Sequence, residues 1–424
     1  MKKVRKIFIF VILLIQIFSI STLADTEIST EITNDIDLEL NSEAAILLEE
    51  KSGIVVYEKN SDKKLYPAST TKILTAILVL ENCNLSDSVI ITKSALESVP
   101  TGYVVGDLRP NEEFTVENML YALLLKSAND VAVVLAEHVS GSVEEFANLM
   151  NKKASEIGCK NTHFVNPNGI HDDNHYTTAY DLALIAKYCM QNETFKQIVS
   201  VQEYTLPKTN LYAYENRMFD NTNSLILSKS KYYYKYATGI KTGYTKEAGS
   251  CLISSATKDN VNYISVVLNS DSSKYLKDTR FVDATSLFDY GFENFEYTEF
   301  KKENEVINKI EIGNATKDTR ELNLKIENAL ICFNKVDFDF DKLEPKIELQ
   351  EDIKAPISKD QVLGTVTYVI DGIEYKSNLL AMNDVIEKPN YLLFIVGLVI
   401  LFLGILILKL KPKKKKKTRA RKRK

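Results

Sequence analysis

Residues 43–295 alternate between two hydrophobic periods, and this alternation predicts a mixed domain. Two short apolar runs, 44–48 and 54–57, flank a Lys-Ser-Gly turn and predict a β-hairpin. Apolar residues at helical spacing follow, and extended apolar runs return later. Helices inserted between early and late strands of one sheet are typical of the α+β class. The predicted helices cover 69–80, 116–139, 143–157 and 273–290, and the predicted late strands cover 249–257 and 262–269.

The pattern changes at residue 296, where short alternating or apolar runs separated by turn residues begin. Several short strands at close spacing predict a small all-β sandwich over residues 296–388. This region contains no histidine and no carboxylate cluster with metal-ligand spacing, so we expect it to serve as a structural stalk. The predicted strands cover 306–312, 322–326, 329–333, 362–370 and 373–380.

The N-terminal end carries a targeting pattern. Residues 2–6 are basic, residues 7–20 are nearly all apolar, and Thr22-Leu23-Ala24 supplies small residues for a signal peptidase. This three-part pattern predicts a secretory signal peptide over residues 1–24, with an uncleaved N-terminal anchor as the alternative. The following residues, 25–42, lack apolar periodicity and predict a flexible lead-in.

The C-terminal end predicts a membrane anchor. An uninterrupted run of apolar residues and glycine at 391–408 predicts a transmembrane helix over 390–410. The tail at 411–424 is strongly basic, and basic tails stay on the cytoplasmic side of a membrane. We therefore expect a protein held in the cell membrane by one C-terminal helix, with residues 25–388 outside the cytoplasm.

The net charge of -4 hides an uneven distribution. Sixteen cations lie in the terminal segments 2–6 and 409–424, which leaves 37 of the 53 Lys and Arg against 57 Asp and Glu. A body with a charge of about -20 repels phosphate backbones, which argues against nucleic acid as a partner. The 5 cysteines form no paired motif, so we expect mostly buried thiols and leave one disulfide open.

Three short motifs with chemical potential occur in order along the first domain. Each motif is common by chance, but their order and their spacing of 58 and then 114 residues make the set specific. The motifs are S-x-x-K, S-x-N and K-T-G, formed by Ser69 and Lys72, by Ser127 and Asn129, and by Lys241, Thr242 and Gly243.

The first motif can generate a nucleophile. Residues three apart lie on one face of a helix, so the Lys72 amine can reach the Ser69 hydroxyl. That hydroxyl attacks only when a neighbouring base accepts its proton, which requires a neutral lysine. Burial and a second cation, for which Lys241 is the candidate, would lower the pKa of Lys72. Ser69 near a helix N-terminus also places its own backbone N–H where an oxyanion can sit.

Each motif residue also has an ordinary structural interpretation. Ser69 suits a helix N-cap, Lys72 suits a solvated helix face, and the Ser127–Asn129 segment suits a helix-ending turn. We favour catalysis because the residues occur together and in this order.

With these motifs the chain resembles the serine D-alanyl-D-alanine carboxypeptidases, low-molecular-mass penicillin-binding proteins that share an acyl-serine fold with class A β-lactamases. The likeness covers residues 43–295, including the segments 168–170 and 176–182, and it extends to the following β domain and anchor. It implies a transpeptidase-like fold, an antiparallel sheet with helices. The family's anchor is often an amphipathic surface helix, whereas here the segment is apolar enough to span a membrane.

The resemblance implies a reaction and roles for the first two motifs. Ser69 would attack the carbonyl between two terminal D-alanines and form an acyl-enzyme, with Lys72 as general base. Ser127 would relay a proton to the leaving nitrogen, and Asn129 would orient the acyl side chain. Peptidoglycan stem peptides would be the substrates, β-lactam antibiotics would acylate the same serine, and neither a cofactor nor a metal would be needed.

The resemblance also implies how the third motif binds substrate. Lys241 and Thr242 would hold the terminal carboxylate, and Gly243 would let the strand approach the ligand closely. The backbone N–H groups of the nucleophile and of Tyr244 would form the oxyanion hole. Arg280 would be a longer-range partner of the carboxylate, with a surface ion pair as the alternative.

Two histidines deserve a separate prediction. His171 and His175 lie beside Asp172 and Asp173, which superficially suggests a metal cluster. Their polar surroundings favour a solvated loop at the rim of the cleft. Cys251, on the strand after the third motif, is predicted to lie in the core.

Two other functions compete with the carboxypeptidase. A β-lactamase needs a carboxylate to activate the deacylating water, usually in an E-x-x-L-N element, and none occurs between Asn129 and Lys241. A catalytically silent wall-binding protein would not need the intact motif residues. The sequence therefore favours the carboxypeptidase.

Overall fold

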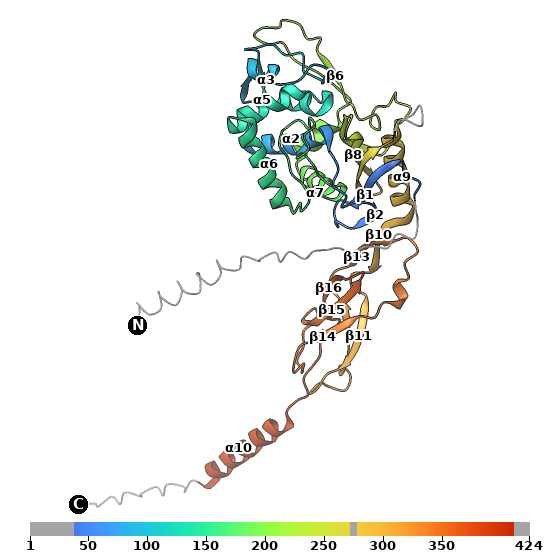
Figure 1. The fold of residues 1–424 in the computed structure, drawn as a ribbon. Coiled ribbons are helices and arrows are strands. Elements are labelled where there is room, and N and C mark those ends of the chain that lie inside the picture. Colours follow the sequence, from blue (N-terminus) through green and yellow to red (C-terminus); the bar gives the residue numbers. More distant parts are fainter. Residues whose placement is uncertain (1–37, 272–277, 411–424) are drawn as a thin grey trace, which may run out of the picture. The chain divides into compact units, whose positions relative to one another are not determined.

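The computed structural model describes residues 38–271 and 278–410, and Figure 1 shows its helices and strands. The predicted signal peptide, most of the lead-in and the basic tail at 411–424 lie outside the described residues. The chain divides into two compact units. The first contains residues up to Tyr297 together with Phe333–Phe338, and the second contains Thr298–Cys332 and the residues from Asp339 onward.

The first unit is built on one antiparallel sheet with the strand order β2-β1-β9-β8-β7. Its early strands pair with its late strands, as the α+β prediction requires, and Leu47 lies opposite Ser265. The predicted hairpin and both late strands are confirmed within one or two residues. The strands are β1 (Ser42–Glu49), β2 (Val55–Lys59), β7 (Ala237–Thr245), β8 (Gly249–Lys258) and β9 (Val261–Ser270).

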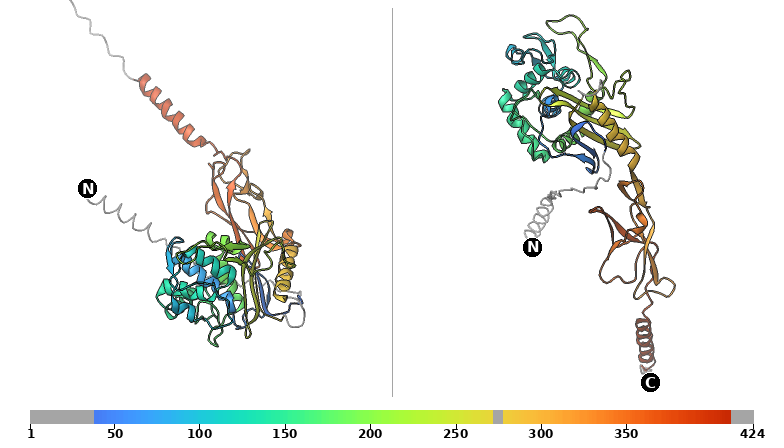
Figure 2. Two further views of the ribbon diagram at one scale, coloured as in Figure 1. Left: turned by 90° about the horizontal axis from the view of Figure 1, so that it is seen from above. Right: turned by 45° about the vertical axis from the view of Figure 1, so that its right-hand side comes forward.

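The sheet is covered on both faces, which explains the continuous apolar runs of β1 and β9. Ala44, Ile46 and Leu48 enter a large core shared with the helices on one face. Leu47 points to the other face, where Gly291 of helix α9 (Thr279–Asn294) packs so closely that a methyl group there would lie 2.8 Å from the leucine. Figure 2 shows α9 on one side of the sheet and the helical cluster on the other.

The helical cluster surrounds α2 (Lys72–Asn82), whose residues from Lys72 to Val79 are all buried. A helix buried on every side explains why the apolar positions of this segment are nearly continuous. The neighbouring helices are α3 (Lys93–Glu97), α4 (Val116–Tyr121), α5 (Asn129–Ser140), α6 (Val143–Ile157), α7 (Ala179–Cys189) and α8 (Glu193–Ser200). The prediction for 143–157 is thus confirmed at both ends.

Two helix predictions need correction, both at a motif. The continuous helix predicted over 116–139 is wrong, because α4 passes into a π-helical turn, η2 (Ala122–Lys126), and the chain breaks before α5. The break follows from Ser127, which adopts a left-handed conformation with φ +66°. The segment at 69–80 begins as a 3₁₀ turn, η1 (Ala68–Thr71), before α2 starts at Lys72. In a 3₁₀ turn residues i and i+3 eclipse, which favours the Ser69–Lys72 contact.

The second unit is all-β, as predicted. Its sheet has the antiparallel order β11-β12-β16-β15-β14. Buried and exposed residues alternate along its strands, with Leu322, Leu324 and Ile326 all facing its core. The strands are β11 (Val306–Glu311), β12 (Glu321–Ile326), β14 (Lys346–Leu349), β15 (Val362–Ile370) and β16 (Ile373–Ala381), and a separate two-stranded sheet joins β10 (Phe295–Lys301) with β13 (Leu330–Lys335).

Helix α10 (Tyr391–Leu410) follows the last strand of the second unit along the chain. An 18-residue window of this helix has a mean hydropathy of 3.1 and none of it is buried in the protein, so by length and composition the helix can cross a membrane. All five cysteines are free, and Cys251 is fully buried, as predicted.

Candidate active site

The first motif converges on the amine of Lys72, which is completely buried. Its Nζ lies 2.9 Å from Ser69 Oγ, 2.9 Å from Asn129 Oδ1 and 2.6 Å from the carbonyl oxygen of Asn168. A neutral amine has two N–H donors and one lone pair. The donors suffice for the asparagine oxygens, which leaves the lone pair facing the Ser69 hydroxyl. This geometry permits proton transfer from the serine to the lysine.

Electrostatics favour the neutral form of this lysine. Burial, followed by the positive charge of Lys241, holds the pKa of Lys72 well below its ordinary value, while Asp130 opposes the shift. These are the two causes expected from the sequence. The Asp130 carboxylate is itself buried and accepts hydrogen bonds from the Gly106 backbone N–H at 2.9 and 3.1 Å, and burial raises its pKa.

The second motif occupies the break between η2 and α5. Ser127 adopts the left-handed conformation at this break, and the residue is buried. Asn129, the first residue of α5, donates from both its backbone N–H and its side-chain amide to the carbonyl oxygen of Val104, each at 2.9 Å. These bonds aim the remaining side-chain oxygen of Asn129 at Lys72 and hold the Val104 segment beside the site.

The third motif approaches the nucleophile along the edge strand β7. At Gly243 an added methyl group would lie 3.0 Å from the carbonyl oxygen of Pro67 and 3.0 Å from the backbone nitrogen of Ser69. Glycine is therefore needed for the strand to lie against η1. Thr242 donates its hydroxyl to Thr222 at 2.6 Å, and the Tyr244 side chain is exposed.

Lys241, on the same strand, carries a second buried amine. It is 1% exposed, and its Nζ donates to the carbonyl oxygen of Thr242 at 3.0 Å. Burial, followed by the charge of Arg280, lowers the pKa of Lys241 to about 7. Arg280 on α9 also contacts the strand directly, because its Nη1 donates to the carbonyl oxygen of Gly243 at 3.0 Å. Its ion pair with Asp278, at 2.7 Å, is therefore only part of its environment.

The loop at 165–175 supplies site residues that the motifs did not identify. The Asn168 carbonyl binds Lys72, and Gly169, at φ +78°, packs so tightly on η1 that a methyl group would lie 1.9 Å from the carbonyl oxygen of Ala68. The prediction of a solvated loop is wrong for His175, which is 2% exposed. The turn sequence Asn-Pro-Asn-Gly was the available signal, since it predicts a left-handed glycine.

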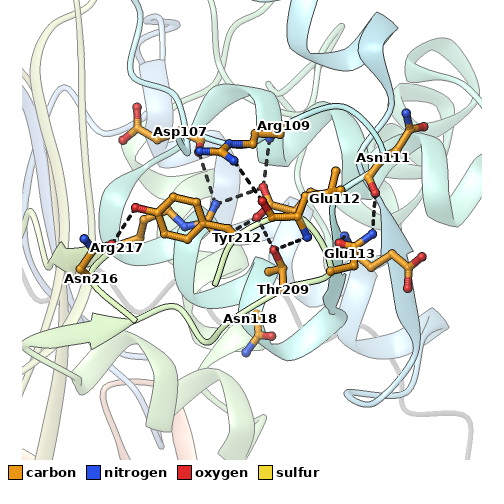
Figure 3. A network of polar contacts seen from close by, with 12 residues as sticks. Asp107, Arg109, Asn111, Glu112, Glu113, Asn118, Thr209, Tyr212, Asn216 and Arg217 are labelled. Carbon is orange, nitrogen blue, oxygen red and sulfur yellow. Dashed lines mark hydrogen bonds and ion pairs between the residues drawn. The ribbon is translucent and has the colours of Figure 1, made fainter. Parts of the chain in front are cut away.

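A buried ion pair between Glu112 and Arg217 was also unpredicted, and Figure 3 shows it within a network of polar contacts. Arg217 bridges both carboxylate oxygens of Glu112, at 2.7 and 3.1 Å, and Thr209 donates to the same carboxylate at 2.5 Å. Burial opposes the charge on Glu112, but these hydrogen bonds keep the pKa of Glu112 below its usual range. The Arg217 guanidinium also lies 4.4 Å from the Tyr212 ring centroid. The pair therefore joins two segments about 100 residues apart.

Comparisons with known proteins agree with this geometry. A sequence model of the family described as D-alanyl-D-alanine carboxypeptidase matches residues 29–272, and one described as the C-terminal domain of penicillin-binding protein 5 matches residues 295–387. D-alanyl-D-alanine carboxypeptidase DacF of Bacillus subtilis is 33% identical over 343 residues, which cover 80% of this chain and 84% of that protein. DacA of Haemophilus influenzae is 31% identical over 338 residues, covering 77% and 81%.

Solved structures show the same fold. Penicillin binding protein 5 from Haemophilus influenzae matches with a TM-score of 0.61 at 29% identity, covering 84% of this chain and 100% of that chain. The Streptomyces K15 DD-transpeptidase matches with a TM-score of 0.56 at 33% identity, covering 61% of this chain and 99% of that chain. Because the family match spans more than half of the chain and the three motifs meet in one site, the chain belongs to the D-alanyl-D-alanine carboxypeptidase family of low-molecular-mass penicillin-binding proteins.

Proposed function

We propose that this protein removes the terminal D-alanine from peptidoglycan stem peptides through an acyl-enzyme formed on Ser69. The contact between Ser69 Oγ and the buried Lys72 amine, at 2.9 Å, is the observation that carries the proposal. Lys72 accepts the hydroxyl proton as the serine attacks the carbonyl between the two D-alanines. The acyl group is then bound to Ser69, and water releases the shortened peptide.

Ser127 relays the proton to the leaving D-alanine nitrogen, and Asn129 orients the acyl chain. Lys241 and Thr242 bind the terminal carboxylate, and Arg280, whose Nη1 donates to the Gly243 carbonyl oxygen, contributes positive charge. The close approach of Gly243 to the backbone nitrogen of the nucleophile supports an oxyanion hole formed by the N–H groups of Ser69 and Tyr244. Each N–H stabilises the negative charge that develops in the transition state.

β-Lactam antibiotics acylate the same serine in this proposal. In the part of the chain that the structure describes, the Lys72 amine bonds a hydroxyl and two amide oxygens, and no carboxylate is among these hydrogen-bond partners. Because the sequence between Asn129 and Lys241 also lacks the E-x-x-L-N carboxylate with which a class A β-lactamase activates water against the penicillin adduct, that adduct should persist.

The decisive experiment uses the full chain in detergent. We expect release of D-alanine from a diacyl-D-Ala-D-Ala peptide, and a covalent penicillin adduct that mass spectrometry locates on Ser69. Ser69→Ala should abolish both, whereas Ser61→Ala, at a serine that bonds Glu58 instead, should retain both. Activity that survives in Ser69→Ala would refute the mechanism, and rapid penicillin turnover would favour a β-lactamase.

We also propose a division of labour along the chain. Residues 1–24 form a cleaved signal peptide, 25–42 a lead-in, 43–295 the peptidase domain and 296–388 a spacer. Residues 390–410 anchor the protein in the cell membrane, and 411–424 remain in the cytoplasm. A chain that ends at residue 388 should be released from membranes, and protease added outside intact cells should digest the peptidase domain of the anchored protein. Retention of the shortened chain on membranes would contradict the anchor.

A further inference from the structure

His175 lies outside the three motifs, yet it reaches the turn that carries the nucleophile. Its Nε2 lies 2.8 Å from the hydroxyl of Thr71, which is fully buried in η1. That hydroxyl in turn lies 2.8 Å from the carbonyl oxygen of Ala68, the residue before Ser69. A chain of two hydrogen bonds therefore connects the imidazole with the backbone next to the nucleophile.

The donor and acceptor of each of these two hydrogen bonds follow from the contact made by the other ring nitrogen of His175. The backbone N–H of Val165 donates to Nδ1 of His175 at 3.1 Å, so Nδ1 is unprotonated. The ring proton then resides on Nε2, which donates to the Thr71 oxygen. Since that oxygen accepts a hydrogen bond from the histidine N–H, the threonine O–H is free to donate to the Ala68 carbonyl. Only the neutral Nε2–H tautomer of His175 satisfies all three contacts.

The carbonyl that accepts the second hydrogen bond belongs to Ala68, a residue with a strained backbone conformation. Ala68 has φ +49°, a conformation that is unfavourable for a non-glycine residue and persists only where its surroundings enforce it. The Thr71 hydroxyl donates to this carbonyl, and Gly169 packs closely against both the carbonyl and the Thr71 hydroxyl. Ala68 directly precedes Ser69, so its orientation determines where the Ser69 N–H and hydroxyl point.

We infer that His175 is a positioning residue for acylation, which acts through the Thr71 hydroxyl to hold Ala68 and thereby Ser69 in the reactive geometry. This inference rests on the proposed function. It assigns a task to a histidine that touches neither the Ser69 hydroxyl nor the Lys72 amine. The imidazolium could not replace the neutral ring, because a protonated Nδ1 would face the Val165 N–H with a second donor.

The surroundings keep the ring in its neutral form. Burial lowers the pKa of His175 to about 3, with smaller contributions of the same sign from His163, Lys72 and His171 and an opposing one from Asp172. The Phe164 ring also packs edge-on against the imidazole, with centroids 5.3 Å apart. The positioning contact therefore persists throughout the pH range in which the lysines of the site titrate.

The test measures the second-order rate constant for acylation by a fluorescent penicillin, together with the stoichiometry of labelling and the melting temperature. We expect His175→Leu to slow acylation by about 10- to 100-fold, the range typical of lost supporting hydrogen bonds. His175→Gln supplies one donor and one acceptor and should stay within about threefold of wild type. His163→Leu, at an exposed histidine of the same loop, is the matched control and should leave the rate unchanged.

The route through Thr71 is tested by a double-mutant cycle. Thr71→Val should slow acylation about as much as His175→Leu, Thr71→Ser should retain the rate, and the double variant should be no slower than the slower single variant. Additive losses would overturn the inference, as would a correctly folded His175→Leu that reacts at the wild-type rate. If His175→Leu fails to fold, the Thr71→Val and Thr71→Ser pair decides instead. Failure of wild type to react would refute the proposed function itself.

Discussion

The peptidase unit and the β unit differ in where their charged side chains lie: the site of the first unit buries them, whereas the second keeps most of them in solvent. Around the site, Lys72, Lys241 and Asp130 are each at most 1% exposed. In the β unit most ion pairs join exposed side chains, as between Arg320 and Glu311, which are 55% and 65% exposed. Burial shifts the pKa of the first group strongly, whereas solvent screens the second. The comparison shows that the desolvation cost of buried charge falls at the site, where it provides reactive groups.

The backbone shows the same contrast. All five non-glycine residues with positive φ from 298 to 388 are Asn or Asp, which tolerate that conformation. Among the described residues of the whole chain, only Ala68 and Ser127 combine positive φ with another side chain type. Both belong to the catalytic motifs or flank them. Strain is therefore concentrated where the nucleophile and its relay are held, which is typical of functional sites.

The largest expected effect comes from Gly169→Ala. The new methyl group would meet the Ala68 carbonyl oxygen at 1.9 Å and would also strain a residue at φ +78°. We expect acylation to fall at least 100-fold and stability to fall by about 4 kcal/mol or more. Gly313→Ala in the β unit is the control, since nothing lies within 4 Å of its added methyl group. Equal behaviour of the two variants in acylation and denaturation assays would contradict the comparison.

Lys241→Met should raise the stability of the protein while lowering its activity. Removing a buried amine relieves its desolvation, so we expect the free energy of unfolding at pH 7 to rise by about 1–4 kcal/mol. Loss of the carboxylate partner should at the same time lower acylation by about 10²-fold or more. Urea denaturation and penicillin labelling measure the two quantities. A variant that is less stable than wild type would show that Lys241 supports the fold instead of straining it.

Arg280→Gln should change how the free energy of unfolding depends on pH. The folded pKa of Lys241 is about 7, below its unfolded value, so its contribution to stability is lost as pH falls from the unfolded pKa toward 7. Burial is the largest cause of this lowered pKa, and the charge of Arg280 is the second. Removing that charge should raise the pKa of Lys241 in the folded protein and narrow the pH range over which stability changes. Unfolding free energies measured from pH 6 to 10 should show the change. The effect should vanish in a Lys241→Met background, and its persistence there would assign it to another group.

The smallest effect is expected for Arg320→Gln in the β unit. Its partner Glu311 is mostly exposed, so solvent screens the attraction. We expect the unfolding free energy to change by less than about 0.5 kcal/mol and acylation to stay at the wild-type rate. A loss comparable with that caused by substitutions at the site would remove the distinction between the two units.

The sequence predicted the bounds of regular helices and strands better than the backbone conformation around the site. The helix at 143–157 and the strands at 249–257 and 262–269 were predictable because their apolar spacing is strong and local. The helix at 116–139 was overpredicted, since the residues around Ser127 keep helical periodicity while the backbone breaks. A left-handed serine has no sequence signature, because contacts from elsewhere in the fold enforce it.

The sequence by itself determined which residues carry the chemistry, since S-x-x-K, S-x-N and K-T-G specify reactive groups and the first motif needs only a local turn to join its serine with its lysine. Tertiary structure alone decided what makes that lysine a base. Burial, the Lys241 charge and the Asn168 carbonyl all reach Lys72 across the fold. It also decided the placement of His175 and the pairing of Glu112 with Arg217, because burial and charge pairing depend on distances in space and not on separation along the chain.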